Sequence, residues 1–589
     1  MLNSTGDRRG DAVDTSDTYS RRERLMNRLH ARRAARTRPA TGFQSNPEPK
    51  MIGHYARGRQ LLAGNFLFSG HLIEAPGVNL WDAAERVTTS TNSVHGFAWL
   101  DDLVAVGDTK ARVAAQKWVS DWIARYGHGR GAGWTPDITG RRLIRWIGHG
   151  FFLLRGADKE ASQAYFKSAA QQAIFLSRRW QVARAGLPRF EALAGMIYAG
   201  LSLQGMEDRV EPAIAVLARD CKIQIGPDGG IASRNPEELL EILTLLTWVE
   251  TALSGSGREV PETMLSAMAR MAPALRAMRH SDGGLARFHG GGRGLDGWLD
   301  QALAAVGTME QPDQGLHMGY GRLAAGRTSL IADTAAPPLG VAAAEAHAST
   351  LAMELTSGRR PLIVNCGSGS SFGPEWRRAG RATPSHSTLC IDGVSSAQIA
   401  VRKDGAELLC DGPKEVQSEF TVLGDGNRLE MAHDGYRRSH GLTHVRTLDL
   451  SQDGRALAGE DLLTILETFD EPLFDKALDT EKLQGIPWSV RFHLHPEVDA
   501  IVDLGGAAVS LTQKSGEIWV FRHDGAGEMR LEPSVYLENG RLRPRATQQV
   551  VLSGRAMSYA TRIRWSLSKA QDTPTALRDV KENQPEFDV

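Results

Sequence analysis

The strongest constraint on this 589-residue chain is a change of sequence pattern near residue 317. Before it, apolar residues recur at helical spacing in the segments 118–126, 140–154, 159–180, 189–204 and 236–253. After it, apolar runs are short, and Gly, Asp, Asn and Ser separate them roughly every 8–15 residues, as in strands joined by turns. A single core rarely serves so long a chain. The pattern therefore predicts an α+β protein of several domains, with helix hairpins followed by an antiparallel β-sandwich.

Helix ends support the helical half of this prediction. In the run Asn235-Pro236-Glu237-Glu238, an N-cap residue precedes a proline and two acids that complement the positive end of the helix dipole. Short glycine-containing breaks at 127–129 and 226–230 separate the apolar stripes. Many helices with short links are typical of antiparallel helix hairpins.

Charge and cysteine content exclude several classes of protein. Lys plus Arg and Asp plus Glu are both 69, so the formal net charge is zero. This balance argues against nucleic acid or an anionic membrane as a bulk electrostatic partner, although a locally basic cleft for an acidic polysaccharide remains compatible with it. No two of the four cysteines form a CxxC pair, which favours buried free thiols over a metal knuckle or redox site; they are Cys221, Cys366, Cys390 and Cys410.

The chain ends carry no export or membrane signal that we identify. No stretch approaches the ~18 apolar residues that a membrane-spanning helix needs, and no apolar region precedes a cleavage site, so we expect no transmembrane segment and no signal peptide. We expect residues 1–45, with a basic run over 21–36, to be a solvated and poorly ordered tail, although contact with nucleic acid or lipid is an alternative. Residues 570–589 are polar, and we expect them to be loose.

Tryptophans are concentrated before residue 300, and their faces can stack on sugar rings. Trp118 and Trp122 lie one turn apart on an apolar stripe, which favours core packing. For Trp81, Trp99 and Trp134, near expected loops, core packing and a saccharide groove remain open alternatives.

Several longer stretches carry a resemblance to a known family; they are HMGYGRL (317–323), HASTLAMELTSGRRPLIVNCGSG (347–369), ATPSHSTLCIDG (382–393), HDGYRRSHGLTHVR (433–446) and RFHLHPEV (491–498). Together they resemble the C-terminal domain of heparinase II/III-like proteins. GLPRFEALAGMIYAGLSL (186–203) and PDGGIASRNPEELLEIL (227–243) resemble the helical part of the same family. The resemblance implies an incomplete (α/α) toroid over 46–312 and a β-sandwich over 313–569, which grip an acidic polysaccharide between them.

The resemblance also implies β-elimination on a uronate-containing polysaccharide. A neutralising group offsets the uronate carboxylate, a base removes the C5 proton, and an acid protonates the leaving oxygen. Tyr and His usually serve as base and acid, with Asn, His or Arg on the carboxylate. This chain has Leu187-Pro188-Arg189 where the family has Asn-His, and Ser233-Arg234-Asn235-Pro236 where a Tyr is expected. Glu345 stands two residues before His347, where relatives carry a His.

Other side chains are candidates for the missing roles. Arg189 and Arg234 are candidates for a bidentate pair with a carboxylate, and Asn235 for a hydrogen bond to it. The candidate proton carriers are His289, Tyr320 and Tyr436. We expect His347 and His386 to lie near the cleft. Each candidate has a structural alternative: a helix cap for Asn235, which we favour, a solvated helix end for Arg189, and a hydroxyl tied to backbone for both tyrosines.

A structural zinc ion is the one cofactor that the resemblance raises. The family's ligand positions correspond to His347, Asn365 and His386. Two His and a carboxylate suit zinc, whereas Asn offers only a neutral oxygen and weakens the site. The alternative is that both histidines pack inside the sandwich with hydrogen-bonded rings.

Three functions follow from these observations. The first is a polysaccharide lyase that acts on a uronate-containing polysaccharide. The second is a non-catalytic saccharide-binding protein of envelope polysaccharide metabolism, and the third is an assembly or scaffold role in envelope polysaccharide production. The resemblance implies the periplasm or cell envelope, and the absence of a recognised export signal makes the cytoplasm the alternative.

Overall fold

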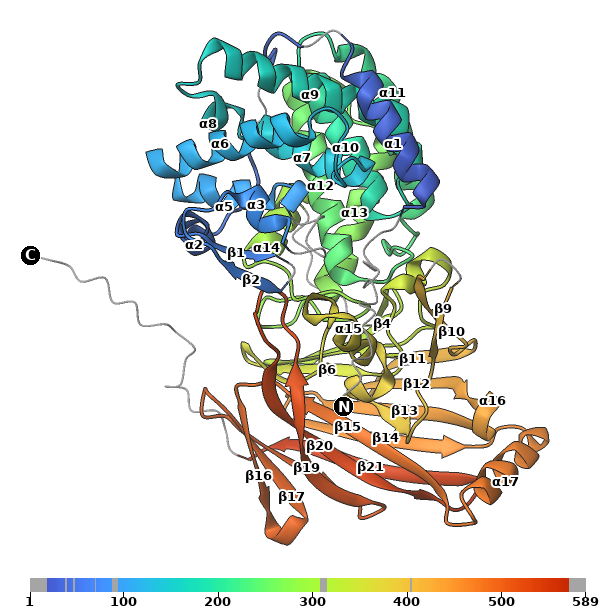
Figure 1. The fold of residues 1–589 in the computed structure, drawn as a ribbon. Coiled ribbons are helices and arrows are strands. Elements are labelled where there is room, and N and C mark those ends of the chain that lie inside the picture. The colour runs from blue at the N-terminus through green and yellow to red at the C-terminus, as the bar shows by residue number, and fades with distance from the viewer. Residues whose placement is uncertain are drawn as a thin grey trace, which may run out of the picture. The chain divides into compact units, whose positions relative to one another are not determined.

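The computed structural model describes residues 19–37, 40–45, 48–68, 70–86, 94–307, 315–402 and 405–570. The chain divides into two compact units (Figure 1). The first, the helical unit, comprises Met1–Leu217, Trp248–Glu259 and Val401–Glu407. The second, the sheet unit, comprises Ala218–Thr247, Val260–Ala400 and Leu408–Val589. Each unit is described by itself.

The helical unit is built from successive helices and one small hairpin. Its helices are α1 (Arg21–Ala34), α2 (Tyr55–Leu62), α3 (Leu80–Ala84), α5 (Ala98–Val106), α6 (Thr109–Tyr126), α7 (Pro136–Gly148), α8 (Gly150–Leu154), α9 (Lys159–Arg179) and α10 (Leu187–Ser202). Strands β1 (Asn65–Phe68) and β2 (His71–Glu74) form the hairpin. Helices α11 (Val210–Gln224) and α12 (Pro236–Gly255) begin or end in this unit.

Helix α1 corrects the prediction of a loose tail, which is wrong over residues 21–34. Ser20 and Glu23 form a capping box, in which each side chain accepts a hydrogen bond from the other residue's backbone N–H. Gln171 then donates to the carbonyl of Ala31 at 3.0 Å, and Arg179 donates to Oδ1 of Asn27 at 2.7 Å. A local cap and one docked face therefore order a segment whose basic composition indicated a solvated tail.

An aromatic core fills the helical unit. The rings of Trp81, Trp99, Trp118, Trp122, Trp134 and Trp146 lie within this core. Trp81, Trp99 and Trp134 each expose 4% or less of their surface, so they pack rather than line a saccharide groove. Their indole N–H groups also have protein partners, as when Trp81 donates to the carbonyl of Trp118 at 2.8 Å.

The sheet unit contains two large antiparallel sheets. The first has the order β11 (Val416–Val422), β12 (Gly426–Tyr436), β13 (Leu442–Ser451), β14 (Ala456–Thr464), β21 (Ala560–Lys569), β18 (Ile518–His523), β17 (Ala508–Gln513) and β16 (Val498–Asp503). The second has the order β19 (Glu528–Tyr536), β20 (Arg545–Ala556), β15 (Ile486–Leu494), β7 (Arg360–Val364), β6 (Met353–Ser357), β5 (Thr328–Asp333), β4 (Tyr320–Ala325) and β3 (Gly315–His317), with β8 (Leu389–Ile391) paired to β15.

Shorter elements complete the chain. The remaining helices are α13 (Glu262–Ala277), α14 (Trp298–Val306), α15 (Pro374–Arg381), α16 (Arg437–His440) and α17 (Glu471–Thr480). Strands β9 (Gln398–Val401) and β10 (Glu407–Cys410) form a separate two-stranded sheet.

One apolar core joins the two large sheets into a sandwich. The ring of Phe492 on β15 lies 4.7 Å from that of Trp565 on β21, so side chains of both sheets meet in this core. Gly459 is required beneath Trp565, because ring atoms lie 2.1 Å from the position that a Cβ would take. The predicted fold class, a helical region followed by antiparallel sheets, is confirmed.

The remaining sequence predictions concern the cysteines, membrane-spanning helices, the domain boundary and the two tails. Cys221, Cys366 and Cys390 are buried free thiols, and Cys410 is half-buried and free. Within the described ranges, no helix combines the length and the apolar character needed to cross a membrane. The domain boundary between 312 and 313 stays a prediction, and the two compact units divide elsewhere. Residues 1–18 and 571–589 of the expected tails lie outside the described residues.

Candidate functional site

Arg234 lies in the sheet unit, just before α12, and protein acceptors engage its guanidinium. Nη2 donates to Oδ1 of Asp333 and to the carbonyl of Gly319, both at 2.5 Å. Nη1 donates to the carbonyls of Ala335 and Ala336 at 3.2 and 2.9 Å. Burial alone lowers the pKa of Arg234, but the Asp333 carboxylate outweighs it and raises the pKa above its ordinary value. The guanidinium N–H groups that would bind a uronate carboxylate therefore already donate to acceptors of the protein.

Asp333, at the end of β5, is the centre of this network. Its carboxylate has no exposure to solvent and accepts from Arg234, from Oγ of Ser349 at 2.7 Å, and from Nε2 of His289 at 3.4 Å. Burial raises the pKa of Asp333, yet Arg234 and His289 together bring it well below its ordinary value. Asp333 is thus an ionised, fully partnered carboxylate rather than a proton carrier.

The bonds of His289 fix its protonation state. Nδ1 accepts a hydrogen bond from the backbone N–H of His347 at 3.2 Å, so the ring proton resides on Nε2 and faces Asp333. Burial lowers the pKa of His289, which keeps the ring neutral. His289 also has a φ of 46°, so its backbone is held in the left-handed region.

Both candidate tyrosines donate to backbone carbonyls. The hydroxyl of Tyr320 donates to the carbonyl of Arg234 at 2.5 Å, and its ring centroid lies 4.7 Å from the Arg234 guanidinium carbon. The hydroxyl of Tyr436 donates to the carbonyl of Leu389 at 3.2 Å, inside the sandwich core. Burial raises the pKa of both tyrosines well above the ordinary value, which opposes a role as catalytic base.

The structure brings His347 and His386 together. Nδ1 of His347 lies 3.1 Å from Nε2 of His386, whose own Nδ1 donates to the carbonyl of Ala382 at 2.9 Å. His386 therefore accepts the proton of His347, and both rings are neutral imidazoles. Burial lowers the pKa of His386 to about 4 and that of His347 well below its ordinary value.

These two histidines and Asn365 fit a zinc ion poorly. The carbonyl oxygen of Asn365 accepts from the backbone N–H of Ser387 at 2.9 Å, and its amide donates to Oε1 of Glu354 at 3.4 Å. Across the described ranges, no group of three His, Cys, Asp or Glu side chains is arranged to hold a metal ion. The expected third ligand is thus already used by the protein.

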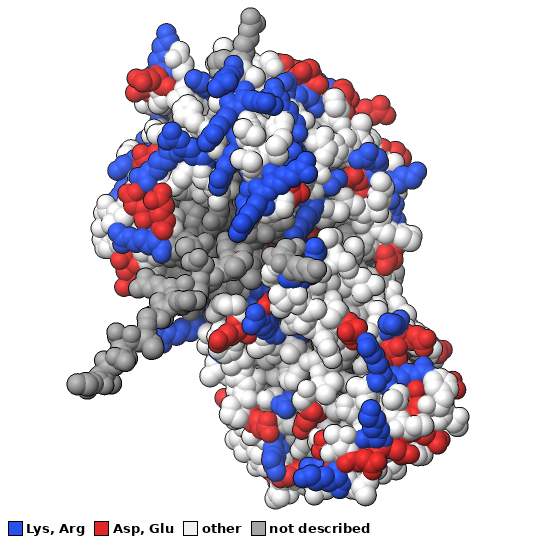
Figure 2. Space-filling view, turned by 45° about the vertical axis from the view of Figure 1, so that its right-hand side comes forward, with Lys and Arg blue, Asp and Glu red and all other residues white. Residues whose placement is uncertain are grey.

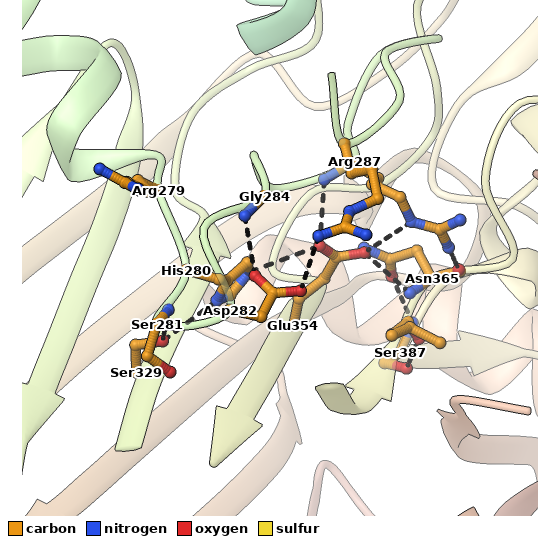
Figure 3. A network of polar contacts seen from close by, with 12 residues as sticks. Arg279, His280, Ser281, Asp282, Gly284, Arg287, Ser329, Glu354, Asn365 and Ser387 are labelled. Atoms are coloured by element: carbon orange, nitrogen blue, oxygen red, sulfur yellow. Dashed lines mark hydrogen bonds and ion pairs between the residues drawn. The ribbon is translucent and has the colours of Figure 1, made fainter. Parts of the chain in front are cut away.

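A second polar network surrounds Glu354 on β6, which sequence reasoning missed. Its carboxylate accepts the backbone N–H groups of Arg287 and Asn365 at 3.0 and 3.1 Å, and lies 3.5 Å from Nε2 of His280. Figure 3 shows Glu354 between His280 on one side and Arg287 and Asn365 on the other. Burial raises the pKa of Glu354, but these partners hold it below its ordinary value. No local pattern marks this glutamate, because its partners come from distant segments.

A third network runs through the sandwich core. Gly435 donates its backbone N–H to Nδ1 of His433, whose Nε2 donates to Nδ1 of His444 at 3.3 Å. Nε2 of His444 then donates to Oδ1 of Asp461 at 2.7 Å, and Arg446 donates to the same carboxylate at 2.7 Å. All four side chains are fully or almost fully buried, so this is a polar part of the core.

The remaining candidates serve local structure. Arg189 donates to the carbonyl of Ala183 at 2.7 and 2.9 Å and lies over the ring of Trp180. Oδ1 of Asn235 accepts from the backbone N–H groups of Glu237 and Glu238 at 2.9 and 3.2 Å, as the helix-cap alternative predicts.

Glu191 on α10 is a titratable group in the helical unit that sequence reasoning missed. Oε1 pairs with Arg141, whereas Oε2 is buried and has no hydrogen-bond partner within the described part of the chain. Burial raises the pKa of Glu191 to about 7, and the charge of Asp137 adds to the effect. A carboxyl that titrates near neutral pH is suited to acid–base work.

Comparisons with known proteins agree on one family. The family model described as "Heparinase II/III-like, C-terminal" matches residues 308–566. FtsZ-localized protein C of Caulobacter vibrioides is 30% identical over 563 residues, which cover 92% of this chain and 92% of that protein.

Solved structures show the same fold at low sequence identity. A structure of heparinase III is 12% identical, with a TM-score of 0.67 over 91% of this chain and 88% of that chain. Heparan sulfate lyase HepC from Pedobacter heparinus is 14% identical, with a TM-score of 0.54 over 93% of this chain and 88% of that chain.

Proposed function

The chain belongs to the heparinase II/III-like family, and from this premise we propose that it is a non-catalytic member, which binds an acidic saccharide at the site of FtsZ assembly. On this proposal the chain has the fold of the lyases but does not catalyse β-elimination. It corresponds to the second of the three functions that the sequence raised.

The observation that supports this proposal is that acceptors of the protein itself already bind the guanidinium of Arg234. Elimination needs a group that neutralises the uronate carboxylate, and it needs a base and an acid that can exchange protons with the substrate. The guanidinium of Arg234 already donates to Asp333 and to four backbone carbonyls. Tyr320 and His289 are bonded within the same network. Freeing Arg234 or His289 for a substrate would leave the buried Asp333 carboxylate with fewer partners.

Saccharide binding is supported by the fold. The similar solved structures include a heparinase III and a heparan sulfate lyase, which act on an acidic polysaccharide. Binding needs complementary shape and charge but no proton transfer, so it can outlast the loss of a catalytic base. An acidic polymer of the cell envelope is the ligand class that we propose.

A relative that matches along 92% of both chains supports a proposal about the place of action. FtsZ-localized protein C shares sequence along 92% of both chains, so the similarity includes the helical unit as well as the sandwich. We propose that this chain likewise localises with FtsZ. This proposal replaces a purely family-based expectation of the periplasm or cell envelope.

Elimination chemistry is tested directly. The purified chain is incubated with heparan sulfate, hyaluronan, alginate and bacterial exopolysaccharides, and the unsaturated product is followed at about 232 nm. We expect flat traces with a measurable affinity for at least one glycan by calorimetry. A steady rise in absorbance would make the protein a lyase, and the absence of binding to every glycan would remove the saccharide from the proposal.

Localisation is tested separately in cells and with purified components. A fluorescent fusion of the full chain should form a band that coincides with FtsZ, and the purified chain should sediment with FtsZ polymers. A fusion that stays dispersed while FtsZ forms its band would overturn this part of the proposal without affecting the glycan result.

An active lyase that uses another residue is a second candidate, and Glu191 is the observation that favours it. Burial raises the pKa of its carboxyl to about 7, and Glu191 lies on α10, the helix on which the family carries Asn-His. If the chain cleaves a glycan, Glu191→Gln should abolish the absorbance increase. Glu211→Gln is the control, because the Glu211 side chain is 71% exposed and pairs with Arg258.

A further inference from the structure

An apolar surface, which we call the α17 patch, lies on helix α17 and on the chain segments next to it. Its members each expose between 36% and 68% of their surface; they are Leu466, Phe469, Leu473, Leu483, Met557 and Tyr559. Figure 1 shows α17 beside α16, at one end of the sandwich. Clustered exposure of large apolar side chains on one part of a surface is typical of an interaction site.

Several contacts show that these residues form one surface. The backbone N–H of Ile465 donates to the carbonyl of Tyr559 at 2.9 Å, which places Leu466 next to the Tyr559 segment. The ring of Tyr559 lies 5.3 Å from that of Phe474 on α17. Sδ of Met557 lies 2.6 Å from the position that a Cβ of Gly485 would take, close to Leu483.

The two faces of α17 differ in what they contact. Phe474 is 1% exposed and packs on the sandwich core, with Ala477 and Leu478 against the same core. Leu473, at the edge of this buried side, is 36% exposed, and Phe469, in the turn before the helix, is 68% exposed although the Arg437 guanidinium carbon lies 5.0 Å from its ring centroid. The helix is therefore docked on one side and open on the other.

Acidic side chains border the α17 patch. Glu467, Glu471, Asp475 and Asp479 are exposed or half-exposed, and among the described residues none of them forms a salt bridge. The exposed cations within this stretch are Lys476 and Lys482, and the neighbouring Arg437 and Arg555 are paired with Asp470 and Glu481. The patch thus combines apolar side chains with an excess of negative charge, and its best partner carries apolar side chains and positive charge.

Helix α1 of the helical unit has the complementary chemistry. Leu25 and Leu29, one turn apart, are 58% and 38% exposed. Five exposed arginines surround them and complete what we call the α1 stripe; they are Arg21, Arg22, Arg28, Arg32 and Arg33. Figure 2 shows that Lys and Arg side chains gather on the part of the surface that belongs to the helical unit.

We propose that the α1 stripe of one copy docks on the α17 patch of a second copy, so that copies of this chain associate head to tail. Leu25 and Leu29 then meet Phe469 and Leu473, and the arginines meet the acidic border. A contact between two different surfaces leaves one of each surface free on the dimer, so further copies can add to form rings or open chains. The inference goes beyond the proposed function and does not depend on it.

Symmetrical alternatives are disfavoured by charge. Pairing two α17 patches would bring Glu471 and Asp475 against their own copies, and pairing two α1 stripes would oppose arginines. One helix on a small apolar surface buries less than about 1,200 Å² in total, which is the size of weak and transient interfaces. We therefore expect association that depends on concentration in the micromolar range.

The experiment is sedimentation velocity on the full chain up to about 100 µM. The wild type should pass from monomer to dimer and larger species. The α1 variant, Leu25→Ser with Leu29→Ser, should stay monomeric, as should the α17 variant, Leu466→Ser with Leu473→Ser. An equimolar mixture of the two variants should form a dimer and nothing larger, because one keeps an intact patch and the other an intact stripe.

Charge reversal tests the same contact without removing apolar side chains. Arg28→Glu and Glu471→Arg should each weaken association at least tenfold, and the two reversed proteins mixed together should regain part of it. Val422→Ser on β11 is the control, since Val422 is 73% exposed and lies outside the patch. Circular dichroism verifies that each variant is folded.

Three results would overturn the proposal. A wild type that remains monomeric over the whole range removes the contact. An α1 variant that still dimerises shows that the patch pairs with itself. Two variants that stay monomeric when mixed show that the stripe and the patch are not partners.

Discussion

Nη2 of Arg234 lies 2.5 Å from Oδ1 of Asp333, a carboxylate with no exposure to solvent. The pair joins the segment before α12 to the end of β5, and four backbone carbonyls accept the other hydrogen bonds of the guanidinium. An arginine in this position resembles a substrate clamp in sequence, but its bonds make it part of the protein's own framework.

Replacing Arg234 should destabilise the protein strongly. Arg234→Met leaves the Asp333 carboxylate buried without its cation, and breaking such a pair typically costs about 3–5 kcal/mol of unfolding free energy. Urea unfolding followed by fluorescence measures the loss. The matched control is Arg438→Met, whose pair with Asp411 is largely exposed, and we expect a change below about 0.5 kcal/mol there. Equal effects of the two changes would contradict the structural role of Arg234.

Stability should fall as the pH drops from about 6.5 toward about 4. Burial lowers the pKa of His386 to about 4, and that of His493 also lies well below its ordinary value. These rings are neutral in the folded chain and take up protons on unfolding within this window, so protonation favours the unfolded state. The lowered pKa of Asp333 works in the same direction at still lower pH, because its contribution is lost as the carboxylate protonates.

Urea midpoints measured across this pH range test the effect. His386→Gln removes one of the groups, so its slope of unfolding free energy against pH should be shallower by up to about 1.4 kcal/mol per pH unit. A His386→Gln variant with the same slope as the wild type would mean that the His386 ring is not neutral in the fold.

Asn235→Ala should shorten or loosen the first turn of α12. The change removes the oxygen that accepts from the backbone N–H groups of Glu237 and Glu238. Loss of such a cap costs about 1 kcal/mol, and Asn235→Asp, which keeps an acceptor, should cost little. Thermal unfolding of the two variants side by side provides the measurement, and similar losses for both would argue against the cap.

Chelation should leave the protein unchanged. The carbonyl oxygen of Asn365 already accepts from Ser387, so His347 and His386 lack a third protein ligand within the described part of the chain. We expect the melting temperature to be the same with EDTA, with added zinc and with neither. A stabilisation by zinc of several degrees that His347→Ala removes would restore the metal site.

Local patterns predicted much of the fold. The cap at Asn235 could be recognised because four consecutive residues carry the whole signal. The strands followed from short apolar runs separated by turn residues, as on β7, where Leu362, Ile363 and Val364 are buried. Helix α1 was missed although Ser20 and Glu23 spell a capping box, because the prediction weighed its basic composition above its local cap.

The candidate site was harder to predict, for a physical reason. Asp333 and Glu354 are single acids in apolar strands. Each is the centre of a polar network only because distant segments supply its hydrogen-bond partners. A motif can place Arg234 near a cleft by resemblance, but it cannot show that the acceptors around its guanidinium are already present. The same limit applied to Trp81 and Trp134, whose burial depends on tertiary packing.

The hydrogen-bonded line from His433 through His444 to Asp461 has a consequence for assembly of the sheet. His433 faces His444 across β12 and β13, and Asp461 lies on β14, so the line crosses three adjacent strands. A slip of any one strand by a single residue would turn its polar side chain to the opposite face. The hydrogen bonds of this line therefore form only when the three strands pair in the native register. Misaligned pairings lose these bonds and are less stable while the sheet is forming.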